Sequence, residues 1–232
     1  MAEGLLPQLL YREYYKRRAA RGQAAFEYRT VAHLPAAHIA GCQGYFINPT
    51  LAGGPVYWMP KFDFPKFLEY NRKYRITQFF TVPPIYLLIA KSPLVSDQFA
   101  TLEHAVTGAA PMGPELTELA EKKLGCNITQ TWGLSETTGS VTIMQFDEHD
   151  STGSISPLMP NTLMRIVDDD DRDVPEGQPG EFVVKGPTIC KGYFGNEKAT
   201  RESFLRDGWF RTGDIGLRKN GTFYIVDRKK VS

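Results

Sequence analysis

The residues best suited to chemistry lie in one run, Gln130 to Gly139, which reads Gln-Thr-Trp-Gly-Leu-Ser-Glu-Thr-Thr-Gly. The run offers hydroxyl groups, backbone N–H groups at its glycines and a single carboxylate, Glu136. Hydroxyl and N–H donors can face phosphate oxygens, while a carboxylate can face a metal ion. The run therefore suits a phosphate group bound together with magnesium. The alternative is a Ser/Thr-rich turn in which Glu136 caps a helix.

A second segment, Thr107 to Met112, reads Thr-Gly-Ala-Ala-Pro-Met and follows an expected strand. Small residues allow a flat ring to lie against the backbone. In open parallel sheets, ligands bind outside the carboxyl ends of the strands. The segment is therefore a candidate binding turn, although taken alone it is also consistent with an ordinary tight turn.

A third segment, Gly208 to Asp214, is followed by a run that ends in Asp227-Arg228-Lys229-Lys230. An aspartate at the end of a strand can accept hydrogen bonds from both hydroxyls of a ribose. An arginine nearby can contact phosphate or ribose oxygens. Asp214 and Arg228 are therefore candidate nucleotide ligands. The alternatives are a turn residue for Asp214 and a surface charge for Arg228.

The elements that must position these residues alternate over the first 150 residues. Asp63 is expected to cap a helix with Pro65 in its first turn, and Gly125 is expected to end another. The expected strands are 30–34, 56–59, 76–82, 103–107 and 127–130, and the expected helices are 7–21, 37–51, 64–74, 84–90 and 114–124. Strands separated by helices of this length imply βαβ crossovers. Residues 1–150 are therefore predicted to form an α/β layer, with a mostly parallel sheet and flanking helices.

The pattern changes after residue 150. Strands are expected at 164–167, 180–184 and 221–226, separated by turn residues. Asp168 to Asp171 is expected at a hairpin tip, since these four carboxylates lack the spacing of an EF-hand calcium loop. Residues 151–232 are therefore predicted to form a β-rich subdomain.

Composition excludes several classes of protein. The chain has 232 residues, of which 42% are hydrophobic and 23% are charged, and this is globular composition. Its net charge is +1, whereas a nucleic-acid-binding protein would show a clear basic excess. The expected partners therefore do not include nucleic acid.

Cysteine usage and hydropathy indicate an intracellular protein without a membrane span. The cysteines Cys42, Cys126 and Cys190 are far apart and form no CxxC pair, which favours reduced thiols over a disulfide framework or zinc site. Residues 30–60 carry no charge, but their histidines, prolines and glycines argue against a spanning helix. The first residues place their charges after a short apolar stretch, the reverse of a signal peptide.

Together and in this order, the motifs resemble the adenylate-forming (AMP-binding) superfamily, in its acyl- and aryl-CoA ligase branch. The 4-coumarate–CoA ligase-like enzymes look most similar. The motifs that carry the resemblance are Gly-Ala-Ala-Pro, Gln-Thr-Trp-Gly-Leu-Ser-Glu, Gly-Tyr-Phe-Gly-Asn, Gly-Trp-Phe-Arg-Thr-Gly-Asp and Val-Asp-Arg-Lys-Lys. An ordered set is far more specific than a single motif.

The resemblance implies activation of a carboxylic acid by Mg²⁺ and ATP, giving an acyl-adenylate and pyrophosphate. The thiolate of CoA then forms the thioester as AMP leaves. The resemblance matches Ser135 and Glu136 to catalytic residues, with Ser135 bonding the α-phosphate and Glu136 holding magnesium. Asp214 would bind the ribose hydroxyls, and Arg228 the ribose or phosphate. The positions matched to ATP-binding residues are Gly108, Ala109, Ala110, Gln130, Thr131, Trp132, Gly133, Ser135, Asp214 and Arg228.

The acyl pocket is expected to involve Gly108 and His38. His38 lies in the run Leu-Pro-Ala-Ala-His-Ile-Ala-Gly, which is similar to the segment of the family beside that pocket. The alternative is a histidine that packs at the start of a helix.

Two parts of the family pattern are not found. The phosphate loop rich in Ser, Thr and Gly is not seen in residues 1–30, and the small C-terminal domain with its adenylation lysine does not follow Lys230. The chain is therefore expected to be part of a large N-terminal domain and to lack ligase activity alone. Its location is expected to be intracellular, either cytoplasmic or peroxisomal. A peroxisomal address would be read at the true C-terminus, which Val231-Ser232 is not expected to be, so the sequence does not choose between the two.

Other functions remain open from the sequence. A non-catalytic nucleotide- or acyl-binding remnant, or an interaction module, is the main alternative. Within the same fold, a luciferase-like enzyme or a peptide-synthetase adenylation domain is a further alternative. A dehydrogenase is disfavoured because no GxGxxG motif follows an expected strand.

Overall fold

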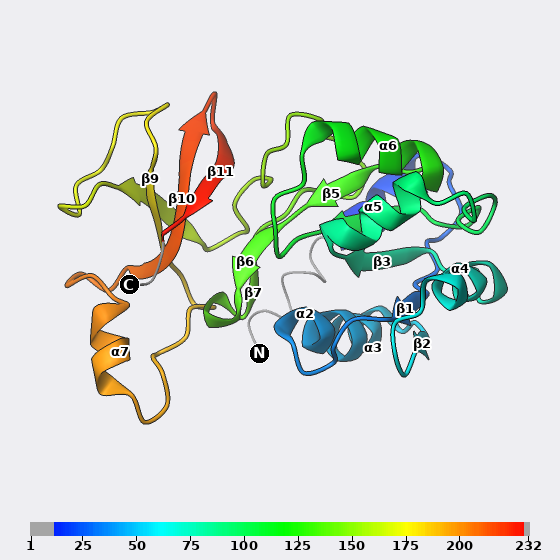
Figure 1. The fold of residues 1–232 in the computed structure, drawn as a ribbon, viewed down its shortest axis with the longest axis horizontal. Coiled ribbons are helices and arrows are strands. Elements are labelled where there is room, and N and C mark those ends of the chain that lie inside the picture. The colour runs from blue at the N-terminus through cyan, green and yellow to red at the C-terminus, as the bar shows by residue number, and fades with distance from the viewer. Residues whose placement is uncertain (1–11, 230–232) are drawn as a thin grey trace. The chain divides into compact units, whose positions relative to one another are not determined.

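The structure is a computed structural model that describes residues 12–229 (Figure 1). Its contacts divide the chain into two compact units. Unit 1 contains the chain up to Thr131 together with Met144–Gly153, and unit 2 contains Trp132–Ile143 and the chain from Ser154 onward. The chain therefore passes between the units more than once: residues 132–143 belong to unit 2, and residues 144–153 belong to unit 1 again.

Unit 1 is built around parallel strands, which confirms the predicted α/β class. Its main sheet has the order β3-β4-β5, and every pair in it is parallel. A separate parallel pair is formed by β1 and β2. The strands are β1 (Thr30–Ala32), β2 (Val56–Trp58), β3 (Gln78–Thr81), β4 (His104–Thr107) and β5 (Ile128–Gln130).

Helices make the crossovers between these strands. α5 connects β3 to β4, α6 connects β4 to β5, and the two helices lie side by side in Figure 1. The helices of unit 1 are α2 (Ile39–Gly41), α3 (Asn48–Ala52), α4 (Phe64–Lys73), α5 (Pro83–Lys91) and α6 (Pro114–Leu124), with the π-helix η1 (Cys42–Ile47) between α2 and α3. Residues 12–20 are also helical, and the start of the helix expected from residue 7 lies outside the described residues.

Local sequence signals set the helix ends as predicted. The side chain of Asp63 accepts a hydrogen bond from the N–H of Lys66 at 2.9 Å and caps α4. Gly125 ends α6 in the left-handed region, at a φ of 75°. The helix expected over residues 37–51 is instead split into α2, η1 and α3. The wider π turn admits one extra residue, and apolar spacing does not encode that insertion.

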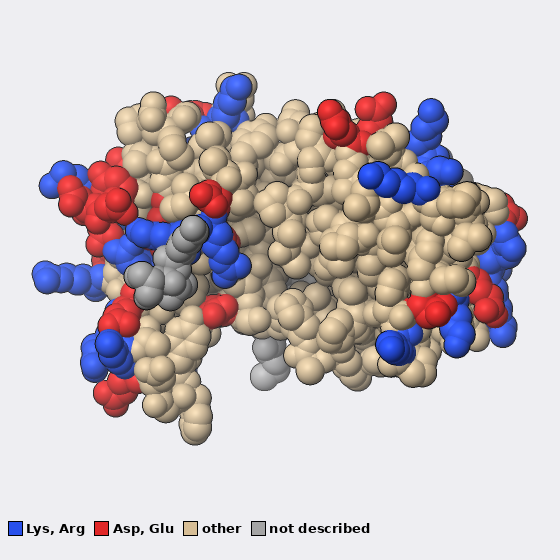
Figure 2. Space-filling model, in the orientation of Figure 1, with Lys and Arg blue, Asp and Glu red and all other residues tan. Residues whose placement is uncertain are grey.

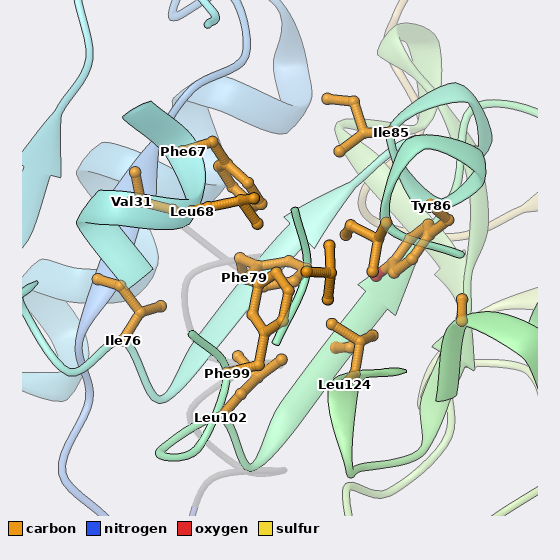
Figure 3. Packing of buried hydrophobic residues seen from close by; sticks show 14 of the residues in the cluster. Val31, Phe67, Leu68, Ile76, Phe79, Ile85, Tyr86, Phe99, Leu102 and Leu124 are labelled. Carbon is orange, nitrogen blue, oxygen red and sulfur yellow. The ribbon is translucent and has the colours of Figure 1, made fainter. Parts of the chain in front are cut away.

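The core of unit 1 lies between its sheet and its helices (Figure 3). Phe79 of β3 is 1% exposed, and its ring centre lies 5.4 Å from that of Phe67 and 6.1 Å from that of Phe99. Tyr86 of α5 is fully buried, and its hydroxyl donates to the backbone oxygen of Val106 at 2.9 Å. Burying an aromatic side chain contributes about 1.5–3 kcal/mol, so these rings stabilise the unit that carries the turn after β4.

A second buried cluster of unit 1 surrounds His104. Its ring centre lies 4.8 Å from that of Tyr14 and 4.4 Å from that of Phe146. Within the described residues, its Nε2 atom has no hydrogen-bond partner. Burial, with a smaller effect of the Arg18 charge, lowers the pKa of His104 to about 3.

Acid is expected to destabilise unit 1 partly through His104. Its folded-state pKa lies below the ordinary value of about 6.5, so the unfolded state binds the proton more readily as pH falls below that value. We expect the substitution His104→Phe to reduce the loss of unfolding free energy between pH 7 and pH 5 by about 2 kcal/mol. Urea unfolding at both pH values measures this loss. The variant Lys122→Gln, at an exposed position of α6, is the control, and equal losses in all three proteins would contradict the prediction.

Unit 2 is mainly antiparallel. Its larger sheet has the order β11-β10-β9-β8, and β6 pairs with β7 in a separate hairpin. The elements are β6 (Trp132–Leu134), the 3₁₀ turn η2 (Ser135–Thr137), β7 (Gly139–Thr142), β8 (Leu163–Val167), β9 (Gly180–Lys185), α7 (Glu197–Glu202), β10 (Phe210–Lys219) and β11 (Thr222–Arg228).

Phe182 is at the centre of unit 2 and is fully buried. Its ring centre lies 5.4 Å from that of Trp132 and 6.1 Å from that of Phe223. Asp168 lies in the turn between β8 and β9, and its Oδ1 accepts from the N–H of Asp170 at 2.9 Å. This turn chemistry is that expected of the predicted hairpin tip.

On the face shown in Figure 2, positive and negative side chains are interspersed, in keeping with the small net charge. Within residues 12–229, no helix is both long enough and apolar enough to cross a membrane.

The three cysteines are free thiols, and burial raises the pKa of the Cys126 thiol to about 12.

Candidate functional site

The turn after β4 is shaped by close packing in unit 1. Gly108 is buried, and a Cβ atom added there would lie 3.0 Å from a ring carbon of Phe80 and 3.0 Å from the backbone oxygen of Thr131. Ala109 has a φ of 67°, an uncommon conformation for a residue with a side chain. Ala109 and Ala110 are exposed, so the turn presents small side chains and backbone to solvent.

Gln130 and Thr131 hold this turn in place. The Gln130 side chain donates from Nε2 to the backbone oxygen of Met112 at 3.1 Å and accepts from the Met112 N–H at 3.3 Å. The Thr131 N–H donates to the backbone oxygen of Thr107 at 2.9 Å. Gln130, through its buried side chain, and Thr131, through its backbone, therefore position the turn.

His38 lies at the start of α2 and is exposed. Its Nδ1 accepts a hydrogen bond from the Ala40 N–H at 3.2 Å, so the side chain caps α2, a role that the sequence analysis did not predict. Tyr45, which the sequence offers as a further candidate for the acyl pocket, supports the segment before His38, a part that sequence reasoning did not predict. The Tyr45 hydroxyl accepts from the N–H groups of His33 at 3.2 Å and Leu34 at 3.0 Å, and no sequence pattern signals these contacts.

Asp214 is nearly buried in unit 2, at 8% exposure. Its Oδ2 accepts from the indole Nε1 of Trp132 at 2.9 Å, and its Oδ1 lies 3.6 Å from Nε of Arg228. Asp214 and Arg228 are partners in the β10–β11 pairing. Burial raises the pKa of Asp214, while Trp132 and Arg228 favour its charged form.

An irregularity in the backbone of β10 immediately precedes Asp214 and fixes its position. Gly213 has a φ of 72°, and the register of β10 with β9 shifts between Arg211 and Ile215. The hydroxyl of Thr212 donates to the backbone oxygen of Phe182 at 2.7 Å and accepts from the Asp214 N–H at 3.1 Å. The Thr212 hydroxyl therefore links the backbone of Asp214 to that of Phe182 in the neighbouring strand.

Ser135 and Glu136 lie in η2, between the strands of the β6–β7 hairpin. Ser135 is exposed, and Glu136 is half-buried. Oε1 of Glu136 accepts from the hydroxyl of Tyr193 at 2.8 Å, and its backbone oxygen accepts from the Cys190 N–H at 2.7 Å. Tyr193 is a supporting residue that we did not assign from the sequence, although it lies in the Gly-Tyr-Phe-Gly-Asn motif.

Gly133 has a packing role within this hairpin. A Cβ atom added there would lie 1.8 Å from the backbone oxygen of Gly139. The glycine is therefore required for the two strands to approach each other.

The donor set of unit 2 fits Mg²⁺ only together with phosphate oxygens. In the described part of the chain, no group of three or more His, Cys, Asp or Glu side chains could hold a metal ion. Mg²⁺ is commonly held by one or two carboxylates together with substrate phosphates and water. Glu136 offers one such carboxylate, and the exposed Ser135 precedes it in the chain, whereas the hydroxyl of Thr138 donates to the backbone oxygen of Thr188 at 2.7 Å.

The predicted site residues thus fall into two sets, one in each unit. Unit 1 brings together Gly108, Ala109, Ala110, Gln130 and Thr131, and it also carries His38. Unit 2 pairs Trp132, Asp214 and Arg228 directly, and it carries Gly133, Ser135 and Glu136 on the β6–β7 hairpin.

Comparisons with known proteins agree with the motifs. A sequence profile described as "AMP-binding enzyme" matches residues 9–194. A protein of Emericella nidulans named as an acyl-coenzyme A synthetase is 52% identical over 99% of this chain and 41% of its own length. The 4-coumarate–CoA ligase 1 of Solanum tuberosum is 35% identical over 85% of this chain and 38% of its own length.

Solved structures show the same fold. The structure of ATP-bound MatB from Rhodopseudomonas palustris matches with a TM-score of 0.79 at 29% identity, covering 87% of this chain and 40% of that chain. The chain therefore spans about two fifths of the length of the relatives that it matches.

Proposed function

We propose, from the premise that the chain belongs to the AMP-binding enzyme family, that it binds the adenosine and phosphate groups of ATP in the activation of a carboxylic acid. In that reaction, a carboxylate oxygen bonds to the α-phosphorus of ATP and pyrophosphate leaves. The thiolate of CoA then bonds to the acyl carbon, and AMP leaves. The relatives named as acyl-CoA synthetase and 4-coumarate–CoA ligase support this class of reaction.

The observation that carries the proposal is the environment of Asp214. A nearly buried carboxylate, held by Trp132 and lying beside Arg228, is pre-organised to accept hydrogen bonds from two ribose hydroxyls. Its Oδ1 faces a cation on an exposed side chain, which can turn to a phosphate. Unit 2 therefore carries the proposed ribose contacts.

The remaining roles follow from the donors present. Ser135 is exposed and would donate to the α-phosphate, and Glu136 would hold Mg²⁺. When bound, Mg²⁺ offsets the negative charge of the phosphates. The small turn of Gly108, Ala109 and Ala110 would admit the adenine ring or the acyl group, and His38 would border the acyl group.

Calorimetric titration tests the proposal. We expect the chain to bind AMP and to discriminate against GMP, and we expect Mg²⁺ to raise its affinity for ATP. Binding at the proposed site requires the ribose hydroxyls, so 2′,3′-dideoxy-AMP should bind more weakly than AMP. Absence of AMP binding at millimolar nucleotide, with the chain folded by circular dichroism, would overturn the proposal.

A further inference from the structure

Glu181 of β9 is a buried carboxylate to which the proposed function gives no role. It is 4% exposed, so a charge there must be matched by close partners. Its Oε2 lies 3.0 Å from Nη1 of Arg211 and 3.6 Å from Nζ of Lys229. Its Oε1 accepts from the backbone N–H of Gly213 at 3.2 Å. Glu181 therefore joins two cations and one main-chain donor in unit 2.

The partners of Glu181 are the sequence neighbours of the proposed nucleotide ligands. Gly213 immediately precedes Asp214, and Lys229 immediately follows Arg228. The two partner segments are also joined directly, because the Lys229 N–H donates to the backbone oxygen of Gly213 at 2.7 Å. Glu181 thus contacts the main chain of the residue before Asp214 and the side chain of the residue after Arg228.

Two exposed aspartates surround this centre. Asp169 lies 2.9 Å from Nζ of Lys229, and Asp171 pairs with Arg211, both from the turn between β8 and β9. Water and salt screen such exposed pairs, so each contributes little by itself. Glu181 is the buried member of the network and is the group whose charge the surrounding structure must satisfy.

We propose that Glu181 is a positioning residue for nucleotide binding, which fixes the Gly213 turn and the end of β11 so that Asp214 and Arg228 face the ribose. The inference rests on the proposed function of Asp214. The left-handed Gly213 lies where the register of β10 with β9 shifts, and Glu181 supplies an acceptor for its N–H. Supporting groups of this kind hold ligand-binding side chains in their productive geometry.

The variant Glu181→Gln tests the proposal because it removes the charge while keeping an oxygen that can accept from Gly213. Lys229→Met is the second variant; it removes one partner at a half-exposed position, at which folding is expected to tolerate the change. Glu202→Gln, at the exposed end of α7, is the matched control. Circular dichroism establishes that each variant is folded.

The first measurement is the ratio of the affinities for AMP and 2′,3′-dideoxy-AMP. In Glu181→Gln, we expect this ratio to fall roughly tenfold, the equivalent of one lost hydrogen bond, while the affinity for the dideoxy nucleotide is unchanged. Lys229→Met should lower the ratio less, and Glu202→Gln should leave it unchanged. If Glu181 only stabilised the fold, its substitution would weaken the binding of AMP and of 2′,3′-dideoxy-AMP equally. An unchanged affinity ratio in Glu181→Gln would therefore overturn the inference.

The second measurement needs no nucleotide. The indole N–H resonance of Trp132, assigned by its loss in Trp132→Phe, reports the hydrogen bond to Asp214. We expect it to shift in Glu181→Gln and Lys229→Met but not in Glu202→Gln. If the wild-type chain binds no nucleotide, the proposed function fails, and an unchanged resonance in these variants would separately overturn the positioning role. If Glu181→Gln does not fold, Lys229→Met decides by the same two criteria.

Discussion

Replacing Asp214 with alanine is expected to weaken AMP binding roughly a hundredfold, because a hydrogen bond to a charged group contributes about 1.5–3 kcal/mol and two ribose hydroxyls would lose their acceptor. The same substitution should have little effect on 2′,3′-dideoxy-AMP, which lacks both hydroxyls. Calorimetric titration of the two nucleotides against wild type and variant measures the difference.

A second variant separates the loss of ribose contacts from damage to the fold. Asp214→Ala also removes the acceptor of the Trp132 indole, whereas Asp214→Asn keeps an oxygen that can accept it. Asp214→Asn should therefore fold with wild-type stability and still bind AMP more weakly than wild type. Asp207→Ala, at an exposed position in the same unit, is the control. Equal losses for AMP and the dideoxy nucleotide would argue against a ribose contact at Asp214.

Gly133→Ala is expected to destabilise unit 2 by about 3 kcal/mol, since the strands of the β6–β7 hairpin must separate to admit the new methyl group. The added Cβ would lie 1.8 Å from the backbone oxygen of Gly139, and backbone at that position has little freedom to move away. Denaturant unfolding followed by tryptophan fluorescence measures the loss.

Gly113→Ala is the matched control for this substitution. Gly113 has a φ of −69°, and a Cβ atom there would meet nothing within 4 Å. Gly113 is the N-cap residue of α6 in unit 1, where alanine is a poorer cap than glycine, so we expect this control to lose at most about 1 kcal/mol. Equal midpoints for Gly133→Ala and Gly113→Ala would contradict the prediction and show that the hairpin can absorb the methyl group.

Local signals predicted most of the elements of unit 1. Capping by Asp63 and termination by Gly125 act within one or two turns of a helix, so the sequence near each boundary was enough. The alternation of strands and helices likewise predicted the parallel crossovers that the structure confirms. The exception is the π-helix Cys42–Ile47, because its extra residue is accommodated by packing.

Unit 2 was harder to predict where its strands carry glycines. β10 was not expected as a strand, because Gly213 and the shift in register interrupt the alternation of side chains. The strands β6 and β7 were interpreted as part of a binding loop, since three-residue and four-residue strands rich in Gly, Ser and Thr resemble turns. Their pairing depends on the close approach of Gly133 and Gly139.

The sequence alone determined the family, because the order of several short motifs is visible without coordinates, and the family profile confirms it. It also determined which residue types could contact a nucleotide. Only the tertiary structure decided how they are held. Trp132 and Asp214 are separated by 82 residues, and Glu181 of β9 meets Arg211 and Gly213 of β10 as well as Lys229, which follows β11. Strand register and a backbone irregularity create these contacts, and neither can be read from the residues next to Asp214 or Glu181 in the chain.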